Sequence, residues 1–357
     1  MLSDHQLACV TELRRVLHAH PEISGQEKFT RAALIDFLKQ HTTLEICPCG
    51  EGFYAAHREE NDLPSIALRA DYDALALPGF GASHLCGHDG HAAALCGVAL
   101  LLENRHVGKN VFLLFQPAEE NGAGAATCLS LFQQEHVDEI YGAHNLPGIP
   151  LGQVTTREGT FACASRGITL RFTGHATHAA YPENGLSPAP AVGKLLCSLP
   201  GLASAERYRG MTLCTVIGVS MGEKAFGAAA ADAEVWLTLR GEHNADLEQL
   251  RERVLNCAAQ LADEWSLRFA FEEQDVFPAT ENHPVYARKV LDKCNGVTLP
   301  VPMRWSEDFG HYLLHCPGAF FGIGAGEACP ALHTEHYEYP DALLDAASSA
   351  FMQLILA

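Results

Sequence analysis

Residues 83–91 read Ser-His-Leu-Cys-Gly-His-Asp-Gly-His, so this short segment holds one thiol, three imidazoles and one carboxylate. An apolar run of good helix formers, residues 92–102, follows at once and predicts that the segment leads into a buried helix. Thiolate, imidazole and carboxylate are the groups that bind zinc and similar divalent ions in proteins. The segment therefore predicts a fold in which a loop and a helix start supply half of a metal site.

The composition limits the class of protein and its partners. A chain of 357 residues exceeds one typical domain, so two domains are expected. The 24 basic and 43 acidic residues give a formal net charge of -19, which argues against nucleic acid and anionic membranes as partners. The 13 cysteines are scattered, the first residues lack a signal-peptide pattern, and no apolar run is long enough to span a bilayer. We expect a cytoplasmic protein with reduced thiols.

Short apolar runs predict a series of buried strands, each followed by polar residues. The runs at residues 65–70, 110–115, 139–143 and 319–324 alternate with helical patterns. This alternation is typical of an α/β fold with a mainly parallel sheet, in which the carboxyl ends of the strands share one edge. The polar residues that follow these strands are Asp71 and Asp73, Glu119 and Glu120, His144, and His333.

The pattern changes after about Gly159. Strand-like runs at residues 168–173, 212–219, 233–240 and 267–271 are interrupted by helical runs at residues 187–199 and 246–265. This β-α-β-β-α-β order is that of a ferredoxin-like domain. We therefore predict a first domain in two parts, residues 1–162 and 276–357, interrupted by an α+β domain at residues 163–275.

Five candidate metal ligands lie on or beside the predicted strand-end loops, namely Cys86, His88, Glu120, His144 and His333. One thiolate, three imidazoles and one carboxylate suit a pair of zinc-like ions, with the thiolate or the carboxylate as the bridge. Glu119 remains beside them without a role as ligand. An acid in that position is suited to be the general base that deprotonates a metal-bound water.

Over nearly all of its length the chain resembles the metallo-amidohydrolase and metallopeptidase family that includes aminoacylase, hippurate hydrolase and the auxin-conjugate (IAA-amino acid) hydrolases. The resemblance depends on the order and spacing of several segments together. These segments are residues 17–22 (LHAHPE), 68–75 (LRADYDAL), 86–91 (CGHDGH), 115–120 (FQPAEE), 142–147 (GAHNLP), 306–309 (SEDF) and 332–333 (LH).

The resemblance implies a three-layer, zinc-peptidase-like catalytic domain that binds two divalent ions through the five candidate ligands. Zinc or manganese is favoured, with cobalt and nickel as alternatives. Glu119 would activate the water and then protonate the leaving amine. The residues expected to support the ligands rather than bind metal are Asp71, Asp73, Asp89 and His91. The expected reaction is hydrolysis of the amide bond of N-acyl amino acids or similar conjugates. The alternatives are a dipeptidase or carboxypeptidase, and a metal-binding protein without activity.

In this family the inserted domain forms a lid and pairs with its copy in a second subunit, so the resemblance implies a homodimer. The motif at residues 174–185 (GHATHAAYPENG) implies that His178 reaches the partner's active site and stabilises the oxyanion, with His175 as the competing assignment. Arg240 matches a substrate-binding arginine. Residues 227–230 (GAAA) replace the family's Asn-x-x-Pro segment, which leaves the identity of the substrate open.

Overall fold

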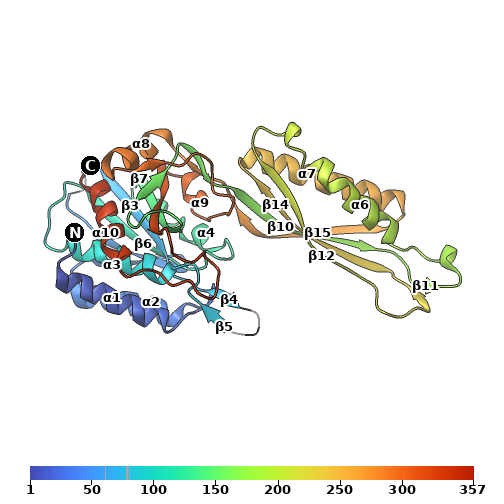
Figure 1. Ribbon diagram of the computed structural model, residues 1–357, viewed down its shortest axis with the longest axis horizontal. Coiled ribbons are helices and arrows are strands. Elements are labelled where there is room, and N and C mark those ends of the chain that lie inside the picture. The colour runs from blue at the N-terminus through green and yellow to red at the C-terminus, as the bar shows by residue number, and fades with distance from the viewer. Residues whose placement is uncertain (61, 78, 80) are drawn as a thin grey trace. The chain divides into compact units, whose positions relative to one another are not determined.

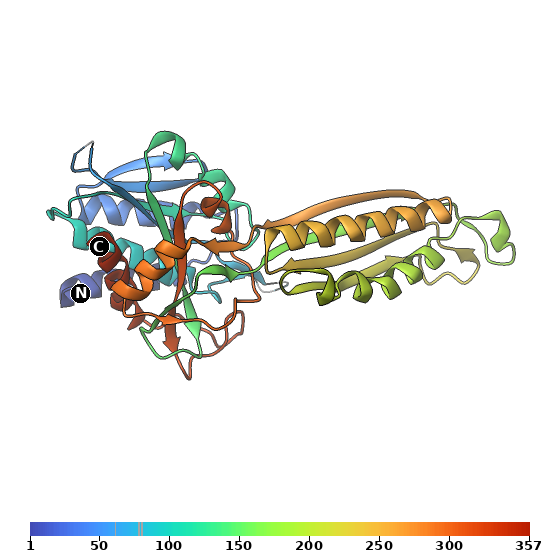
Figure 2. The ribbon, with the colours of Figure 1, turned by 90° about the horizontal axis from the view of Figure 1, so that it is seen from above.

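The computed structural model describes residues 1–60, 62–77, 79 and 81–357. The chain folds into two compact units, which are described separately (Figures 1 and 2). The larger unit contains Met1–Phe161, Thr280–Pro302 and Glu307–Ala357, and the inserted unit contains Ala162–Ala279 and Met303–Ser306.

The boundaries of the inserted unit differ slightly from those drawn on the sequence. The unit continues to Ala279 rather than to residue 275, because the strand β15 still pairs at Phe277, opposite Ser165. The short segment Met303–Ser306 also belongs to it. The main-chain amide of Cys163 donates hydrogen bonds to the carbonyl groups of Met303 and Trp305, which ties this distant segment to the start of the unit.

A large sheet forms the centre of the larger unit. Its strands, in spatial order, are β1 (Glu45–Cys49), β2 (Gly52–His57), β6 (Asn110–Gln116), β3 (Ser65–Asp71), β7 (Glu139–Pro147), β18 (Gly318–Gly326), β8 (Val154–Thr156) and β17 (Val297–Thr298). The central neighbours β6, β3, β7 and β18 are mutually parallel. This confirms the α/β fold with a mainly parallel sheet. Two smaller pairs join β4 (Leu75–Leu77) to β5 (Gly81–Ser83) and β9 (Gly159–Ala162) to β16 (Thr280–Asn282).

Helices cover both faces of this sheet (Figure 1). On one face, Ile66, Leu68 and Ala70 of β3 pack in a hydrophobic core with α1 (Asp4–His18), α2 (Lys28–His41), α3 (His88–Leu102), α8 (Pro284–Lys293) and α10 (Leu343–Ile355). Full burial of a leucine or isoleucine side chain contributes about 1.5–3 kcal/mol. The alternate residue Arg69 points to the other face, toward Asp308, which also contacts α4 (Gly124–Cys128). The remaining short helices of this unit are α5 (Leu131–Gln134) and α9 (Gly310–Leu313).

The inserted unit is built on an antiparallel sheet with the strand order β12 (Thr212–Met221), β14 (Asp232–Gly241), β10 (Ala164–Thr173) and β15 (Arg268–Phe277). The helices α6 (Ala189–Leu202) and α7 (Asn244–Glu264) share one core with this sheet. The β-α-β-β-α-β order predicted from the sequence is therefore confirmed. A small ribbon of β11 (Thr177–His178) and β13 (Ala228–Ala229) extends the unit.

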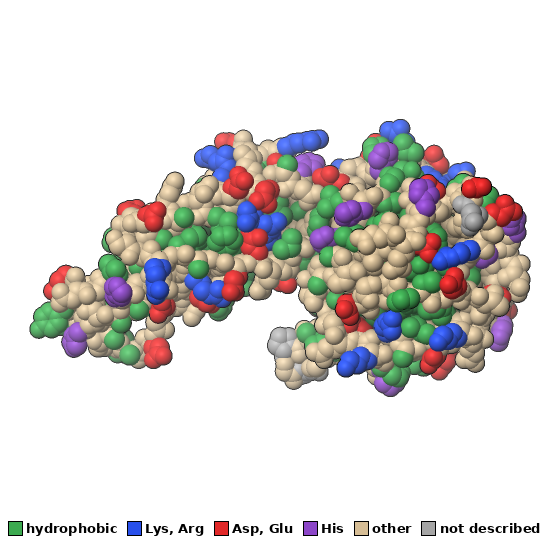
Figure 3. Space-filling model, turned by 180° about the vertical axis from the view of Figure 1, so that it is seen from behind, with side chains coloured by type: hydrophobic (Ala, Val, Ile, Leu, Met, Phe, Trp, Pro, Cys, Tyr) green, Lys and Arg blue, Asp and Glu red, His purple; other side chains and the backbone are tan. Residues whose placement is uncertain are grey.

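The surface of the inserted unit is partly apolar. Figure 3 shows hydrophobic side chains on it between acidic and basic ones. The edge strand β12 exposes Val216, Ile217, Val219 and Met221 by 40% to 61%. Across the helices described in both units, none is long and apolar enough to cross a bilayer.

Candidate metal centre

The parallel pair β3 and β6 places two acidic loops side by side. Asp71 and Gln116 lie opposite each other at the ends of these strands. The chain continues from them to Asp73 and to Glu119 and Glu120, respectively. Asp73 Oδ2 accepts a hydrogen bond from the main-chain amide of Glu120 (3.1 Å), which joins the two loops directly.

Cys86 and His88 are presented by the start of α3. Gly87 precedes the helix with φ 95°, in the left-handed region that favours glycine. A Cβ atom at this position would lie 2.7 Å from Tyr337 Oη and 2.8 Å from Asn145 Oδ1. Only glycine therefore allows the chain to turn here, with Cys86 before the turn and His88 in the first helical turn after it.

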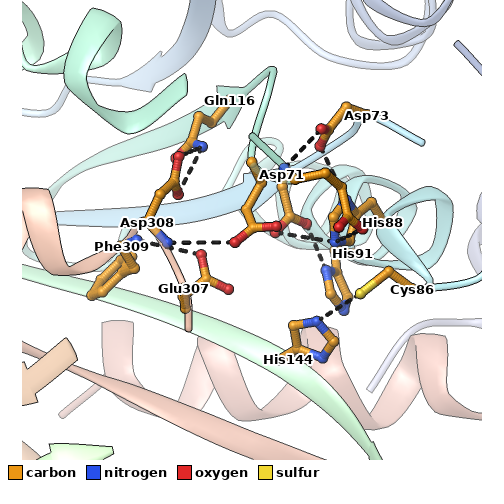
Figure 4. Close-up of polar contacts among 12 residues, drawn as sticks. Asp71, Asp73, Cys86, His88, His91, Gln116, His144, Glu307, Asp308 and Phe309 are labelled. Atoms are coloured by element: carbon orange, nitrogen blue, oxygen red, sulfur yellow. Dashed lines mark hydrogen bonds and ion pairs between the residues drawn. The ribbon is translucent and has the colours of Figure 1, made fainter. Parts of the chain in front are cut away.

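The five donors that the sequence analysis named converge on one place. Cys86 Sγ lies 3.3 Å from Nε2 of His144 and 3.3 Å from Nε2 of His333. Donor atoms of Cys86, His88 and His144 lie within 4.8 Å of one another, and so do those of Cys86, Glu120 and His333. Figure 4 shows Cys86, His88 and His144 grouped in this way. The two groups share Cys86, as two neighbouring metal positions with a common ligand would require.

Hydrogen bonds at Nδ1 orient the rings of His88 and His144 so that Nε2 of each ring faces this centre. Nδ1 of His88 lies 3.1 Å from Oδ1 of Asp73, and a carboxylate only accepts, so Nδ1 carries the proton. His144 likewise donates from Nδ1 to the carbonyl oxygen of Asn145 (2.8 Å). In both rings Nε2 is then the nitrogen that faces the other donors, and partners of this kind commonly fix metal-binding histidines.

Two of the buried donor atoms have no hydrogen-bond partner within the described residues, namely Nε2 of His88 and Oε1 of Glu120, which lie 3.8 Å apart. Buried polar atoms are nearly always paired, so these two facing donor atoms fit a bound cation. The chemistry of the surrounding donors, one sulfur, three nitrogens and one carboxylate, also fits divalent ions of the zinc type.

Burial sets the electrostatics of the centre. It raises the pKa of the Cys86 thiol well above its usual value, and the neighbouring Glu120 raises it further. It also raises the pKa of Glu120 to about 7. Burial, with the adjacent His91, lowers the pKa of His144 well below its usual value, which keeps that ring neutral. Divalent cations at this place would favour the thiolate and the carboxylate, the forms that bind metal.

Glu119 lies beside these donors and has few partners. It is 6% exposed, and its Oε1 accepts a hydrogen bond from the main-chain amide of Asp308 (3.4 Å). Burial raises its pKa well above the usual value, and the nearby carboxylates of Glu307 and Glu120 add to the shift. Its carboxylate lies within 4.8 Å of donor atoms of His88 and Glu120.

Three of the four residues expected to support the ligands contact the centre directly or through one neighbour. Asp73 holds His88, and Asp71 accepts from Nδ1 of His91 (2.6 Å). His91 in turn contacts Asn145, the residue after His144. The fourth, Asp89, contacts the helix α1 at His18 Nδ1 (2.8 Å) and Arg14 Nη1 (3.3 Å). Asp89 therefore joins α1 to the helix that carries His88.

Comparison with known proteins assigns the family. A family model described as peptidase family M20/M25/M40 matches residues 67–357. The chain belongs to this family. The N-acetyl-L-cysteine deacetylase of Bacillus subtilis (strain 168) is 32% identical over 330 residues, which are 87% of this chain and 79% of the relative. IAA-amino acid hydrolase ILR1-like 4 of Arabidopsis thaliana is 28% identical, over 94% of this chain and 82% of the relative.

A solved structure of an M20 protein has the same fold. The Bacillus subtilis YXEP protein, described as a dinuclear metal binding peptidase from the M20 family, is 25% identical. The TM-score is 0.82, and the match covers 99% of this chain and 98% of that chain. The resemblance drawn from the sequence motifs is thus confirmed, and with it the class of metal-dependent amide hydrolases.

Two further predicted residues of this M20 protein lie in the inserted unit. Arg240, on β14, is half-buried, and its Nη1 donates to Ser306 Oγ (2.8 Å) and to the carbonyl oxygen of Arg304 (3.1 Å). His178 is exposed on β11 and pairs with Ala228 of β13, within residues 227–230.

Sequence analysis missed a buried charged network next to the centre. Its hub is Arg69, whose side chain is fully buried in β3 among the carboxylates of Asp71, Glu307 and Asp308. The sequence did carry a signal, because an arginine inside an otherwise apolar strand requires buried partners. Which acids would supply them could not be read from the sequence, since Asp308 lies far along the chain.

Proposed function

We propose that this M20 protein hydrolyses the amide bond of N-acyl amino acids or similar conjugates. The observation that carries the proposal is a buried acid outside the five-donor set, Glu119, next to five converging donor residues. The names of two relatives support the substrate class, since one is an N-acetyl-L-cysteine deacetylase and the other an IAA-amino acid hydrolase.

The chain's own residues would divide the work. Two divalent ions, held by Cys86, His88, Glu120, His144 and His333, would supply Lewis acidity that polarises the amide carbonyl and acidifies water. Glu119 takes the proton from the attacking water and returns it to the nitrogen of the leaving amine. Its buried position, flanked by other carboxylates, favours proton uptake. Asp73 holds the His88 ring so that Nε2 faces inward.

The test is the variant Glu119→Gln, which keeps the size of the side chain and removes its basicity. We expect kcat on an N-acetyl amino acid to fall roughly 10²–10⁴-fold. Bound zinc, measured by elemental analysis, should be unchanged because Glu119 is not a ligand. Glu158→Gln, an exposed glutamate paired with Arg288 on the same unit, is the control and should keep full activity. Full turnover of Glu119→Gln would remove this residue from the mechanism.

The second candidate is a dipeptidase or carboxypeptidase, which the description of the family as peptidases favours. Both reactions use the same centre, so the difference must lie in the substrate pocket. A panel of acetyl-, benzoyl- and aminoacyl-amino acids separates the candidates. Higher kcat/KM on the first two classes supports the deacylase, and higher kcat/KM on the third supports the peptidase.

The proposal includes a homodimer formed by the inserted units, and a cytoplasmic location. The edge strand β12 with its exposed apolar side chains supports a dimer, because uncovered edges of this kind readily pair with another chain. The opposite edge, β15, is better protected, since Glu272 and Glu273 pair there with Arg171 and Arg166. In such a dimer, His178 would stabilise the oxyanion in the partner's active site and Arg240 would bind substrate.

A further inference from the structure

Asp308 makes hydrogen bonds at three places along the loop between Gln116 and Ala125, which carries Glu119. Its Oδ2 accepts a hydrogen bond from Nε2 of Gln116 (2.7 Å), the last residue of β6. The same oxygen accepts from the main-chain amide of Ala125 (2.8 Å), in the first turn of α4. The main-chain amide of Asp308 donates to Glu119 Oε1 (3.4 Å). One residue from a distant segment therefore contacts the beginning, the middle and the end of this loop, and Figure 4 shows it against Gln116.

Arg69 in turn holds Asp308. Its Nη2 donates to Asp308 Oδ1 (2.7 Å), its Nε to Gln116 Oε1 (2.7 Å) and its Nη1 to Asp71 Oδ2 (2.7 Å). The guanidinium is planar and its donors point in fixed directions, so these bonds set the partners at defined positions relative to β3. The carboxylate of Asp308 is thus fixed by charge as well as by neutral hydrogen bonds.

The loop between Gln116 and Ala125 needs such restraint. Ala118 has φ 54°, in the left-handed region, which costs a residue with a side chain about 1–2 kcal/mol. Gly124 lies so close to Pro117 that a Cβ atom on it would be 1.7 Å from that carbonyl oxygen. A loop with this backbone conformation depends on contacts with its surroundings. Loss of the hydrogen bonds with Asp308 would allow Glu119 to move.

We propose that Asp308 is a positioning residue for the reaction, and that it acts by holding Glu119 at the metal centre while Arg69 holds Asp308. This inference rests on the proposed function of Glu119 as the base. A shift of about 1 Å in a reacting group can lower the rate about 100-fold. The network therefore affects the reaction rate as well as the stability of the fold. It also gives a role to the segment at residues 306–309, which sequence comparison matched without assigning one.

The test is Asp308→Asn in the zinc-loaded full chain. Asparagine keeps the shape and the main-chain amide, but its NH2 group must face one of the donors that the carboxylate now accepts from. We expect kcat to fall about 10–100-fold, with KM within about twofold and two zinc ions still bound. If kcat stays within about threefold of the wild type, or if its loss is matched by a loss of zinc or a rise in KM, the proposal is overturned.

Two further variants complete the experiment. Glu59→Gln is the matched control, because Glu59 accepts from the main-chain amides of Val107 and Gly108 in a loop that leads into the opposite end of β6. It should lower the unfolding temperature without changing kcat. If Asp308→Asn does not fold, Gln116→Leu removes two hydrogen bonds to Asp308 and the one that Gln116 accepts from Arg69, and leaves the ion pair between Arg69 and Asp308. Its kcat should fall severalfold, and an unchanged kcat overturns the proposal. Activity in Glu119→Gln would instead refute the proposed function.

Discussion

At the residue scale, the centre depends on which atom of each side chain already makes a hydrogen bond. His88 and His144 each use Nδ1 in a hydrogen bond, which leaves Nε2 toward Cys86 and Glu120. Burial alone would raise the pKa of Asp73, yet the bonds to His88 and Ser24 hold it below the usual value. Asp73 is therefore an ionised acceptor that fixes the His88 ring.

The variant Asp73→Asn tests this arrangement. Loss of the negative charge weakens the bond to His88 Nδ1 and makes Nε2 a poorer ligand. We expect zinc affinity to fall about 10–100-fold, measured by competition with a chromophoric chelator. Asp246→Asn is the control, since Asp246 is also buried but accepts hydrogen bonds from the main-chain amides of Arg209 and Gly210 in the inserted unit. Equal zinc affinity in Asp73→Asn and wild type would contradict this role.

The decisive feature at the scale of elements is how strands and helices end. The sequence pattern predicts that β7 ends at His144. In the structure β7 continues to Pro147, because its parallel pairing with β18 extends to Gly326. His144 is therefore held inside the sheet and not on a loop. The helix α3 begins at His88, earlier than its apolar run, so His88 and His91 share its first turn.

The start of α3 gives a prediction at Gly87. Gly87→Ala adds a side chain at positive φ, which costs about 1–2 kcal/mol, and forces it against Tyr337 and Asn145. Gly108→Ala is a matched control, with φ +73° but nothing within 4 Å of the added Cβ. We expect Gly87→Ala to lower the free energy of unfolding, measured by urea titration, clearly more than Gly108→Ala does, and to weaken zinc binding. Equal losses in the two variants would mean that the close approach is unimportant.

At the scale of the whole molecule the chain has two cores, one in each unit, and the chain crosses between them more than once. The larger unit alone contains all five candidate ligands, Glu119 and the Arg69 network. The inserted unit contributes Arg240 and His178 to the proposed function, together with the apolar edge strand β12. Its predicted role is therefore assembly and substrate binding.

The assembly can be tested on β12. Lysines at Val216 and Val219 would place charge on the exposed edge and disfavour strand pairing. We expect light scattering to give a dimer for the wild type and a monomer for this double variant, with kcat reduced because His178 no longer reaches a partner. Val285→Lys, on an exposed position of α8, should stay dimeric and active. A monomeric wild type would reject both the dimer and the role of His178.

The sequence by itself determined which chemistry is available and roughly where along the chain it occurs. Runs of apolar residues predicted the strands, because local patterns are properties of the sequence alone. Side-chain types predicted metal binding at Cys86, His88, Glu120, His144 and His333. The family followed from the order of the motifs, and the matching model confirms it.

Only the tertiary structure decided which of these groups face each other and which nitrogen of His88 and of His144 points toward the other donors. The partners of Arg69 likewise became known from the fold alone, because Asp71, Gln116 and Asp308 come from separate segments. The physical reason is that hydrogen bonds and ion pairs in a buried site depend on distances of a few ångströms between residues far apart in the chain, and packing of the whole unit sets those distances.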